Sequence, residues 1–197
     1  MTTTAPVGAG RGLARLLLAG GLIGLAASAV LTFDKLRLLE NPAYRPSCSI
    51  NPVISCGSVM RTGQAAVFGF PNPLIGLVAF GALTAVGAGL LAGARYRRWF
   101  WLGLQAGSLA GLAFVVWLIG QALYVIGALC PYCMVVWAVV GPLAWYVTLH
   151  NLRTGVLPAP RRWAGPARFP WSGPALWYLG ITLLVLNRFW FYWRTLI

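Results

Sequence analysis

Five apolar runs, each about as long as a membrane-crossing helix, constrain the fold of this chain more than any other feature. They cover residues 12–33, 73–94, 99–124, 131–149 and 171–187. About 20 helical residues cross the hydrocarbon core of a bilayer. Lipid offers the backbone no hydrogen-bond partners, so a crossing segment must make its backbone hydrogen bonds internally, as a helix does. We therefore expect each run to be a helix. The run 171–187 is the shortest of the five.

The composition agrees with a membrane protein. Hydrophobic residues make up 59% of the 197 residues and charged residues only 9%, whereas a soluble domain carries about 25% charged residues. A chain so poor in charge has too few polar side chains to cover a surface in water. We predict an all-α, polytopic membrane protein in which residues 1–197 form a single integral membrane domain.

The positions of the basic residues predict the orientation. The net charge is +13, with Asp34 and Glu40 as the only acids. Such a charge can indicate nucleic-acid binding, but short clusters of arginine between apolar runs are typical of cytoplasmic loops. These clusters predict a cytoplasmic N-terminus, with residues 34–72 and Cys130 outside, and no nucleic-acid partner. The basic residues of the clusters are Arg11 and Arg15, then Arg95, Arg97 and Arg98, then Arg153, Arg161, Arg162 and Arg168.

Two features of the apolar runs have more than one interpretation. The first run and its Ala27-Ser28-Ala29 tripeptide resemble a secretory signal peptide, but the run continues to Phe33, which favours an uncleaved span. Glycines also recur every four residues, which we interpret as sites of close helix packing. They are Gly20 and Gly24 in the first run, and Gly103, Gly107 and Gly111 in the third.

The motif Cys130-Pro131-Tyr132-Cys133 predicts a redox-active dithiol. Proline suits the first position of a helix. A helix N-terminus stabilises the thiolate of a cysteine that precedes it. Cys130 is therefore expected to be the exchanging thiol, with Cys133 pointing deeper, toward the bilayer.

The other pair, Cys48 and Cys56, lies in the long polar segment. Asn51-Pro52 between them favours a loop that can close into a disulfide, and a mobile loop disulfide beside a fixed dithiol makes a relay. Inert disulfides that staple the loop are one alternative. A zinc site is another, although seven intervening residues fit zinc knuckles poorly. Asp34, Lys35 and Glu40 could cap the loop over the bundle, but solvated charges at the membrane boundary are the favoured interpretation.

Together these motifs resemble the vitamin K epoxide reductase family in its bacterial form. The resemblance covers roughly residues 12–153, with an additional fifth span at about 171–187. It rests on the Cys48-x7-Cys56 and Cys130-x2-Cys133 spacings in this order and on Asn72-x-x-x-Gly76 at the head of the second run. In DsbB-type quinone reductases the CxxC pair comes before the loop pair, so the cysteine order argues against that class.

The resemblance implies a four-helix bundle around a quinone, capped by the cysteine-bearing loop. It implies that Cys48 exchanges with a thioredoxin-fold, DsbA-like partner, that Cys56 attacks Cys130, and that Cys133 reduces the quinone. By the same resemblance, Asn72 binds a quinone carbonyl and Thr62 lies near it. Trp137 stands where vertebrate members have a tyrosine that donates to the second carbonyl; an indole N–H can still donate.

We expect a quinone-dependent thiol–disulfide oxidoreductase of the cytoplasmic membrane that drives disulfide formation in secreted proteins. Its acceptor is expected to be a menaquinone, ubiquinone or vitamin K type quinone, with no metal. Because the chain shows no thioredoxin-like segment, we expect the partner to be a separate protein. The alternative is a non-catalytic scaffold or transporter subunit with structural disulfides.

Overall fold

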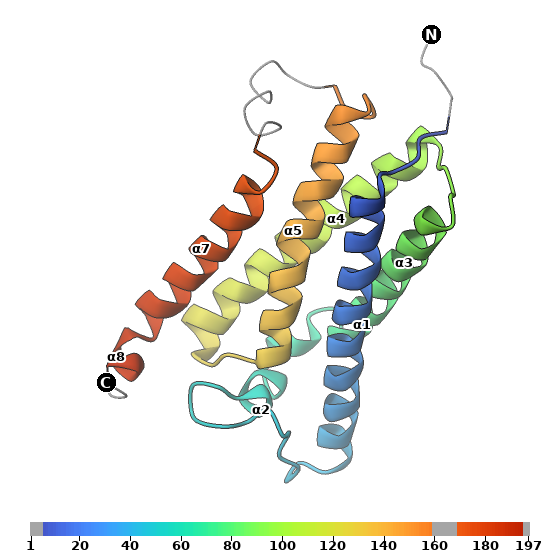
Figure 1. Cartoon of the computed structure of the whole chain (residues 1–197). Helices are drawn as coiled ribbons and strands as arrows, with labels where there is room; N and C mark the ends of the chain where they lie inside the picture. Colours follow the sequence, from blue (N-terminus) through green and yellow to red (C-terminus); the bar gives the residue numbers. More distant parts are fainter. Residues whose placement is uncertain (1–5, 159–168, 195–197) are drawn as a thin grey trace.

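A computed structural model describes residues 6–158 and 169–194 of the chain as a bundle of helices (Figure 1). The bundle consists of α1 (Arg11–Glu40), α3 (Pro73–Leu91), α4 (Arg98–Gly120) and α5 (Pro131–Arg153). A π-helical turn, η2 (Gln121–Ile126), continues α4. These four helices are long and apolar enough to cross a membrane. The predicted all-α, polytopic membrane fold is thereby confirmed.

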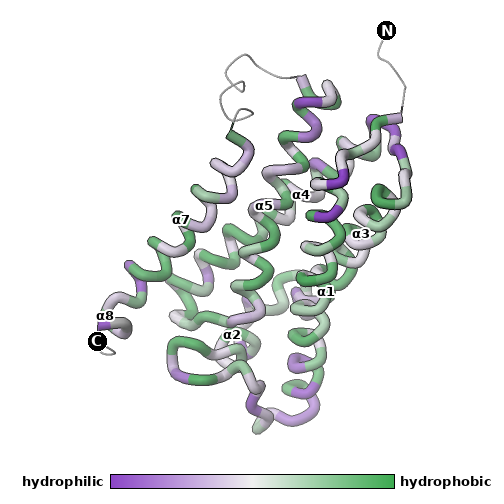
Figure 2. The backbone as a smooth tube through the Cα atoms, in the orientation of Figure 1, coloured by the Kyte–Doolittle hydropathy of each residue, from purple (hydrophilic) through white to green (hydrophobic). Residues whose placement is uncertain are grey.

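The helices are apolar along their length and polar at their ends. Figure 2 shows hydrophilic residues near the N-terminus at one end of the bundle and around the lower end of α1 at the other. Val7 forms an antiparallel bridge with Tyr96, so the N-terminal segment lies beside the α3–α4 connection. The short helix α2 (Cys56–Met60) and the start of α5 lie together at the opposite end (Figure 1).

Helices α1 and α3 pack closely because glycine lets their backbones approach. A Cβ on Gly21 would lie 2.7 Å from the Thr84 backbone nitrogen, and one on Gly24 would overlap the Phe80 ring. The expected close packing at Gly20 and Gly24 is therefore confirmed, with Gly20 facing side chains of α5. The Ala27-Ser28-Ala29 tripeptide lies within α1, with buried residues before and after it, and that the first span is uncleaved stays a prediction.

The glycines of α4 behave differently. Nothing lies within 4 Å of the Cβ position at Gly103, Gly107 or Gly111, so the expected close packing is wrong there. Glycines at the same four-residue spacing thus allow a close helix contact on α1 but border open space on α4.

Helix α1 is longer than the apolar run that predicts it, because the helix continues seven residues past Phe33 to Glu40. Asp34 in this extension is only 5% exposed, so the expectation of a solvated charge is wrong for this residue. Lys35 donates a hydrogen bond to the backbone oxygen of Met60 at 2.6 Å. The hydrogen bond from Lys35 ties the extension to α2 in the loop that covers this end of the bundle.

The fifth predicted helix is present as α7 (Ser172–Arg188), followed by α8 (Trp190–Trp193). It packs against α5, where Trp177 Nε1 donates to the Trp137 carbonyl at 2.9 Å. With 17 residues, α7 is shorter than the four helices that qualify as candidate spans. That it crosses the membrane stays a prediction. Arg161, Arg162 and Arg168 lie outside the described residues.

Candidate dithiol and quinone site

The start of α5 has the geometry that the Cys130-Pro-Tyr-Cys133 motif predicts. Cys130 is the N-cap, Pro131 is the first helical residue, and Cys133 lies in the first turn. The backbone N–H of Cys133 points at Cys130 Sγ, at an N···S distance of 3.5 Å. Both cysteines are free thiols in the structure.

The polar environment lowers the pKa of the Cys130 thiol. The main cause is the hydrogen bond from the Cys133 side chain, and the backbone N–H groups of Cys133 and Tyr132 act in the same direction. Burial opposes them, because it disfavours the thiolate. Cys130 is therefore a better nucleophile and a better leaving group than an ordinary buried thiol.

Cys48 and Cys56 form the disulfide that the sequence allows. Asn51 Oδ1 accepts from the backbone N–H groups of Val53 and Ile54, which turns the chain between the two cysteines. Ser55 then caps α2 by accepting from the Ser58 N–H. Cys56 is consequently the first residue of a short helix, and its side chain is completely buried.

A backbone bridge brings the two cysteine pairs together. Ile54 pairs in parallel with Leu129; the Ser55 N–H donates to the Leu129 oxygen at 2.9 Å, and the Leu129 N–H donates to the Val53 oxygen at 2.7 Å. The bridge pairs Ile54, two residues before Cys56, with Leu129, the residue before Cys130. The two sulfur atoms lie 3.4 Å apart. At this non-bonded separation the Cys130 thiol can attack Cys56 of the Cys48–Cys56 disulfide, and a Cys56 thiolate can attack Cys130 once Cys130 and Cys133 are joined in a disulfide.

A cavity of about 570 Å³ begins at this dithiol and extends through the bundle. Its wall includes Cys130 and Cys133 and follows α4 and η2 from Trp99 to Ile126. Residues of α1, α2, α3 and α5 complete it, together with Gln64 and Ala65 of the loop. The wall is almost wholly apolar. Ligand pockets have volumes of about 300–1,000 Å³, so the space suits a lipid-soluble molecule of quinone size.

The three predicted quinone contacts are placed differently. Asn72 lines the cavity; its Nδ2 donates to the Gln64 oxygen at 2.7 Å and its Oδ1 accepts from the Val67 N–H. Trp137 also lines the cavity, and its buried Nε1 has no hydrogen-bond partner in the described structure. The hydroxyl of Thr62 donates to the Val59 oxygen at 2.8 Å and is not part of the wall.

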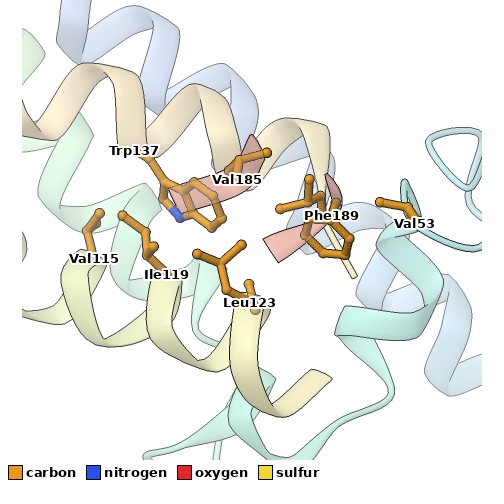
Figure 3. Close-up of a cluster of buried hydrophobic side chains, with 9 residues drawn as sticks. Val53, Val115, Ile119, Leu123, Trp137, Val185 and Phe189 are labelled. Atoms are coloured by element: carbon orange, nitrogen blue, oxygen red, sulfur yellow. The ribbon is translucent and has the colours of Figure 1, made fainter. Parts of the chain in front are cut away.

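Figure 3 shows how Trp137 is held. Its indole ring lies against Ile119 of α4 and Leu123 of η2, with Val185 of α7 nearby. A buried N–H without a partner is costly in a folded protein. An acceptor on a bound molecule would remove this cost, so Trp137 fits a quinone carbonyl.

Several wall residues were not predicted as site residues. Gly103, Gly107 and Gly111 leave space along α4, and Lys35 and Gln121 add polar groups to the wall. The glycine spacing and the polar residues can be read from the sequence. Their position around one cavity cannot, because it depends on long-range packing of the helices. Within residues 6–158 and 169–194, no group of three or more His, Cys, Asp or Glu side chains is placed to hold a metal ion.

The fold and the site together define a class of protein: a membrane thiol–disulfide oxidoreductase with an apolar substrate cavity. The model of the vitamin K epoxide reductase family matches residues 15–148, well over half of the chain, and the protein belongs to this family. Enzymes of this family are quinone oxidoreductases, so membership implies a quinone-linked thiol–disulfide reductase. Comparison with curated proteins gave no match.

Proposed function

We propose that this chain passes electrons from a thioredoxin-fold, DsbA-like protein to a menaquinone, ubiquinone or vitamin K type quinone, and so drives disulfide formation in secreted proteins. The observation that carries the proposal is the 3.4 Å contact between Cys56 Sγ and Cys130 Sγ, with Cys133 at the cavity wall. One pair can therefore exchange with the other while the second pair faces the acceptor.

The reaction proceeds through two disulfide exchanges. The partner's dithiol reduces Cys48–Cys56 and becomes a disulfide itself. The Cys56 thiolate then attacks Cys130 of an oxidised Cys130–Cys133 pair, which forms the Cys56–Cys130 bond and releases Cys133 as a thiolate. Cys48 attacks Cys56 next and releases Cys130. The reduced Cys130–Cys133 dithiol gives two electrons and two protons to the quinone and returns to the disulfide.

The quinone contacts belong to the same proposal. We assign Trp137 Nε1 to one quinone carbonyl because it is buried without a partner. We assign the remaining N–H of the Asn72 amide to the other, since Asn72 lines the cavity beside the loop. Thr62 supports the turn that positions Asn72, as the N-cap of the short helix η1 (Gly63–Ala66).

The topology we propose follows from where the charged residues lie in the bundle. Arg95 and Arg97 lie in the α3–α4 connection beside the N-terminal segment, at the end opposite the cysteines. Basic clusters of this kind mark the cytoplasmic side, so we place the N-terminus in the cytoplasm and both cysteine pairs outside. The proposed domain is one integral membrane unit, a bacterial-type core at about 12–153 with α7 as a fifth span.

The exchange is tested by trapping its intermediate. In Cys48→Ser, the Cys56–Cys130 disulfide cannot be resolved by Cys48, so we expect it to accumulate in membranes when Cys133 is alkylated as it is released. Non-reducing peptide mapping detects the crosslink, and Cys48→Ser combined with Cys130→Ser is the control. Absence of this crosslink would favour a scaffold with structural disulfides.

The electron acceptor is tested on the purified protein. We expect quinone reduction when a reduced thioredoxin-fold protein is added to the wild type, and none with Cys133→Ala. Retained quinone reduction in Cys133→Ala would contradict the proposed route, because Cys133 is the member of its pair that the route assigns to the quinone.

A further inference from the structure

Asp34 is a buried acid on the part of α1 that packs against the cysteine-bearing loop. It lies on α1 three residues after Leu31 and four before Leu38, so the three side chains share one helix face. Leu31 and Leu38 belong to the buried cluster that contains Cys48, Cys56 and Cys130. Asp34 is therefore directed at the place where the disulfides exchange.

The carboxyl group of Asp34 is only half satisfied. Its Oδ1 accepts a hydrogen bond from the Tyr44 hydroxyl at 2.9 Å. Its Oδ2 is buried and has no hydrogen-bond partner in the described part of the chain. Buried polar atoms are nearly always paired, and an unpaired one in a native structure calls for an explanation. An oxygen with a free lone pair can accept a proton.

The carboxylate is close enough to Cys130 to act on it electrostatically. Hydrogen bonding from Cys133 is the main cause of the lowered pKa of Cys130, whereas the negative charge of Asp34 raises that pKa. A thiolate at Cys130 and a carboxylate at Asp34 therefore disfavour each other. A proton on either group relieves the repulsion.

The other charged and titratable groups around Asp34 have contacts of their own. Lys35 donates to the Met60 oxygen, and the Arg37 guanidinium lies over the Phe33 ring at 4.4 Å and the Tyr44 ring at 5.9 Å. Arg61 donates to the backbone oxygens of residues 42 and 44. From α5, Tyr132 and Cys133 join the same cluster beside Cys130.

Disulfide exchange at this place has a proton to move. When Cys56 attacks Cys130, the Cys56 thiol must first lose its proton, and when Cys130 leaves, its thiolate must gain one. Both cysteine residues are at most 1% exposed, so water is a poor partner for either step. Among the described residues, Asp34 is the acid with a buried oxygen that has no hydrogen-bond partner, and we expect it to take over this role.

We propose that Asp34 is the proton acceptor and donor of the exchange between Cys56 and Cys130, an assignment that rests on the proposed function. Asp34 Oδ2 takes the proton from Cys56 as the Cys56–Cys130 bond forms and the Cys130–Cys133 bond breaks. It returns the proton to Cys130 when Cys48 attacks Cys56. In the first step Cys133 leaves as a thiolate, and in the second step Cys48 loses its own proton, which offsets the proton that Cys133 must gain. Over the two steps Cys48 and Cys56 lose two electrons and two protons, Cys130 and Cys133 gain two electrons and two protons, and the Asp34 carboxylate is regenerated.

Two variants separate proton transfer from structural support. Asp34→Asn keeps an oxygen that can accept from Tyr44 but cannot take up the proton. Tyr44→Phe removes the hydrogen bond and keeps the carboxylate. Asp34→Glu restores a carboxylate with one more methylene. The assay is the rate at which the Cys56–Cys130 disulfide forms in the Cys48→Ser background, measured by acid quench and peptide mapping from about pH 6 to pH 9, a range that spans the ordinary thiol pKa.

We expect the rate in Asp34→Asn to be about 100-fold lower at neutral pH, the lower end of what a positioned general base contributes. In this variant the rate should rise about tenfold per pH unit, since free thiolate must now be supplied, and it should approach the wild-type rate near the thiol pKa. The recovery at high pH also shows that the variant is folded. Tyr44→Phe should keep the shallow pH profile of the wild type, and Asp34→Glu should recover most of the rate.

If the wild-type protein is active, either of two results would overturn the proton-transfer role of Asp34 and leave the proposed function intact. One is a pH profile of Asp34→Asn parallel to that of the wild type, which indicates a structural role. The other is an equal loss in Tyr44→Phe. A wild-type protein with no exchange between Cys56 and Cys130 and no quinone reduction overturns the proposed function, and this assignment with it.

Discussion

Lys35→Met is expected to loosen the short helix that holds Cys56 over Cys130. A helix of five residues such as α2 is not stable alone. Lys35 Nζ donates to the oxygen of Met60, the last residue of α2, at 2.6 Å. Hydrogen bonds from charged groups contribute about 1.5–3 kcal/mol, and since Lys35 is half-buried we take the lower value, about 1.5 kcal/mol. Loss of this bond should raise the equilibrium population of molecules in which α2 is detached from the bundle roughly tenfold.

The measurement uses Cys130 as the reporter. In a Cys133→Ala background with the Cys48–Cys56 disulfide intact, Cys130 is the one remaining free thiol, and it is 1% exposed. A charged alkylating reagent cannot enter the apolar cavity, so it must wait for α2 to lift. We expect alkylation about ten times faster in Lys35→Met and nearly unchanged in Lys35→Arg, which keeps a cationic donor. Equal rates in Lys35→Met and its parent would refute the reasoning.

Three further predictions concern the cavity and the loop. Trp137→Phe should raise the KM for quinone about two- to tenfold, the effect of one lost hydrogen bond, without slowing disulfide exchange; an unchanged KM would remove Trp137 from the site. Gly107→Leu should fill open space and abolish quinone reduction while thermal stability is retained; activity at the wild-type level would place the quinone elsewhere. The pKa of Tyr44 is raised, chiefly by its hydrogen bond to Asp34. The contribution of this hydrogen bond to stability should therefore be complete below about pH 10 and be lost as the pH rises through the raised pKa. Ultraviolet difference titration against Tyr44→Phe measures the pKa, which Asp34→Asn should bring back down.

The helices could be predicted from the sequence because membrane spans depend mainly on local composition. Runs of about 20 apolar residues become helices wherever lipid surrounds them, and Pro73 and Pro131 mark two of the helix starts. The end of α1 could not be predicted in the same way. Beyond Phe33 the helix is held by Tyr44 and Met60, which lie ten and 25 residues from their partners on α1.

The cysteine spacing predicted the two pairs but not how they meet. The contact between Cys56 and Cys130 depends on the bridge between Ile54 and Leu129, which are 75 positions apart and carry no sequence signal for pairing. The burial of Asp34 was missed for a related reason, since a charge next to an apolar run is usually solvated. Only the loop folding back over α1 buries it.

The four cysteines differ in what can reach them, and this difference gives the proposed relay its direction. Cys48 is itself only 7% exposed, but it lies two residues from Ile50, which is 72% exposed, so the loop at Cys48 is where we expect a protein partner to bind and open the disulfide. Cys56 and Cys130 are buried against each other, so neither a soluble reductant nor water has easy access to the exchange between the pairs. Cys133 lines the apolar cavity, where a lipid-soluble acceptor can lie. In the proposed relay the donor and the acceptor meet different sulfurs, so the electrons pass through the Cys56–Cys130 contact and the protein partner does not reduce the quinone directly.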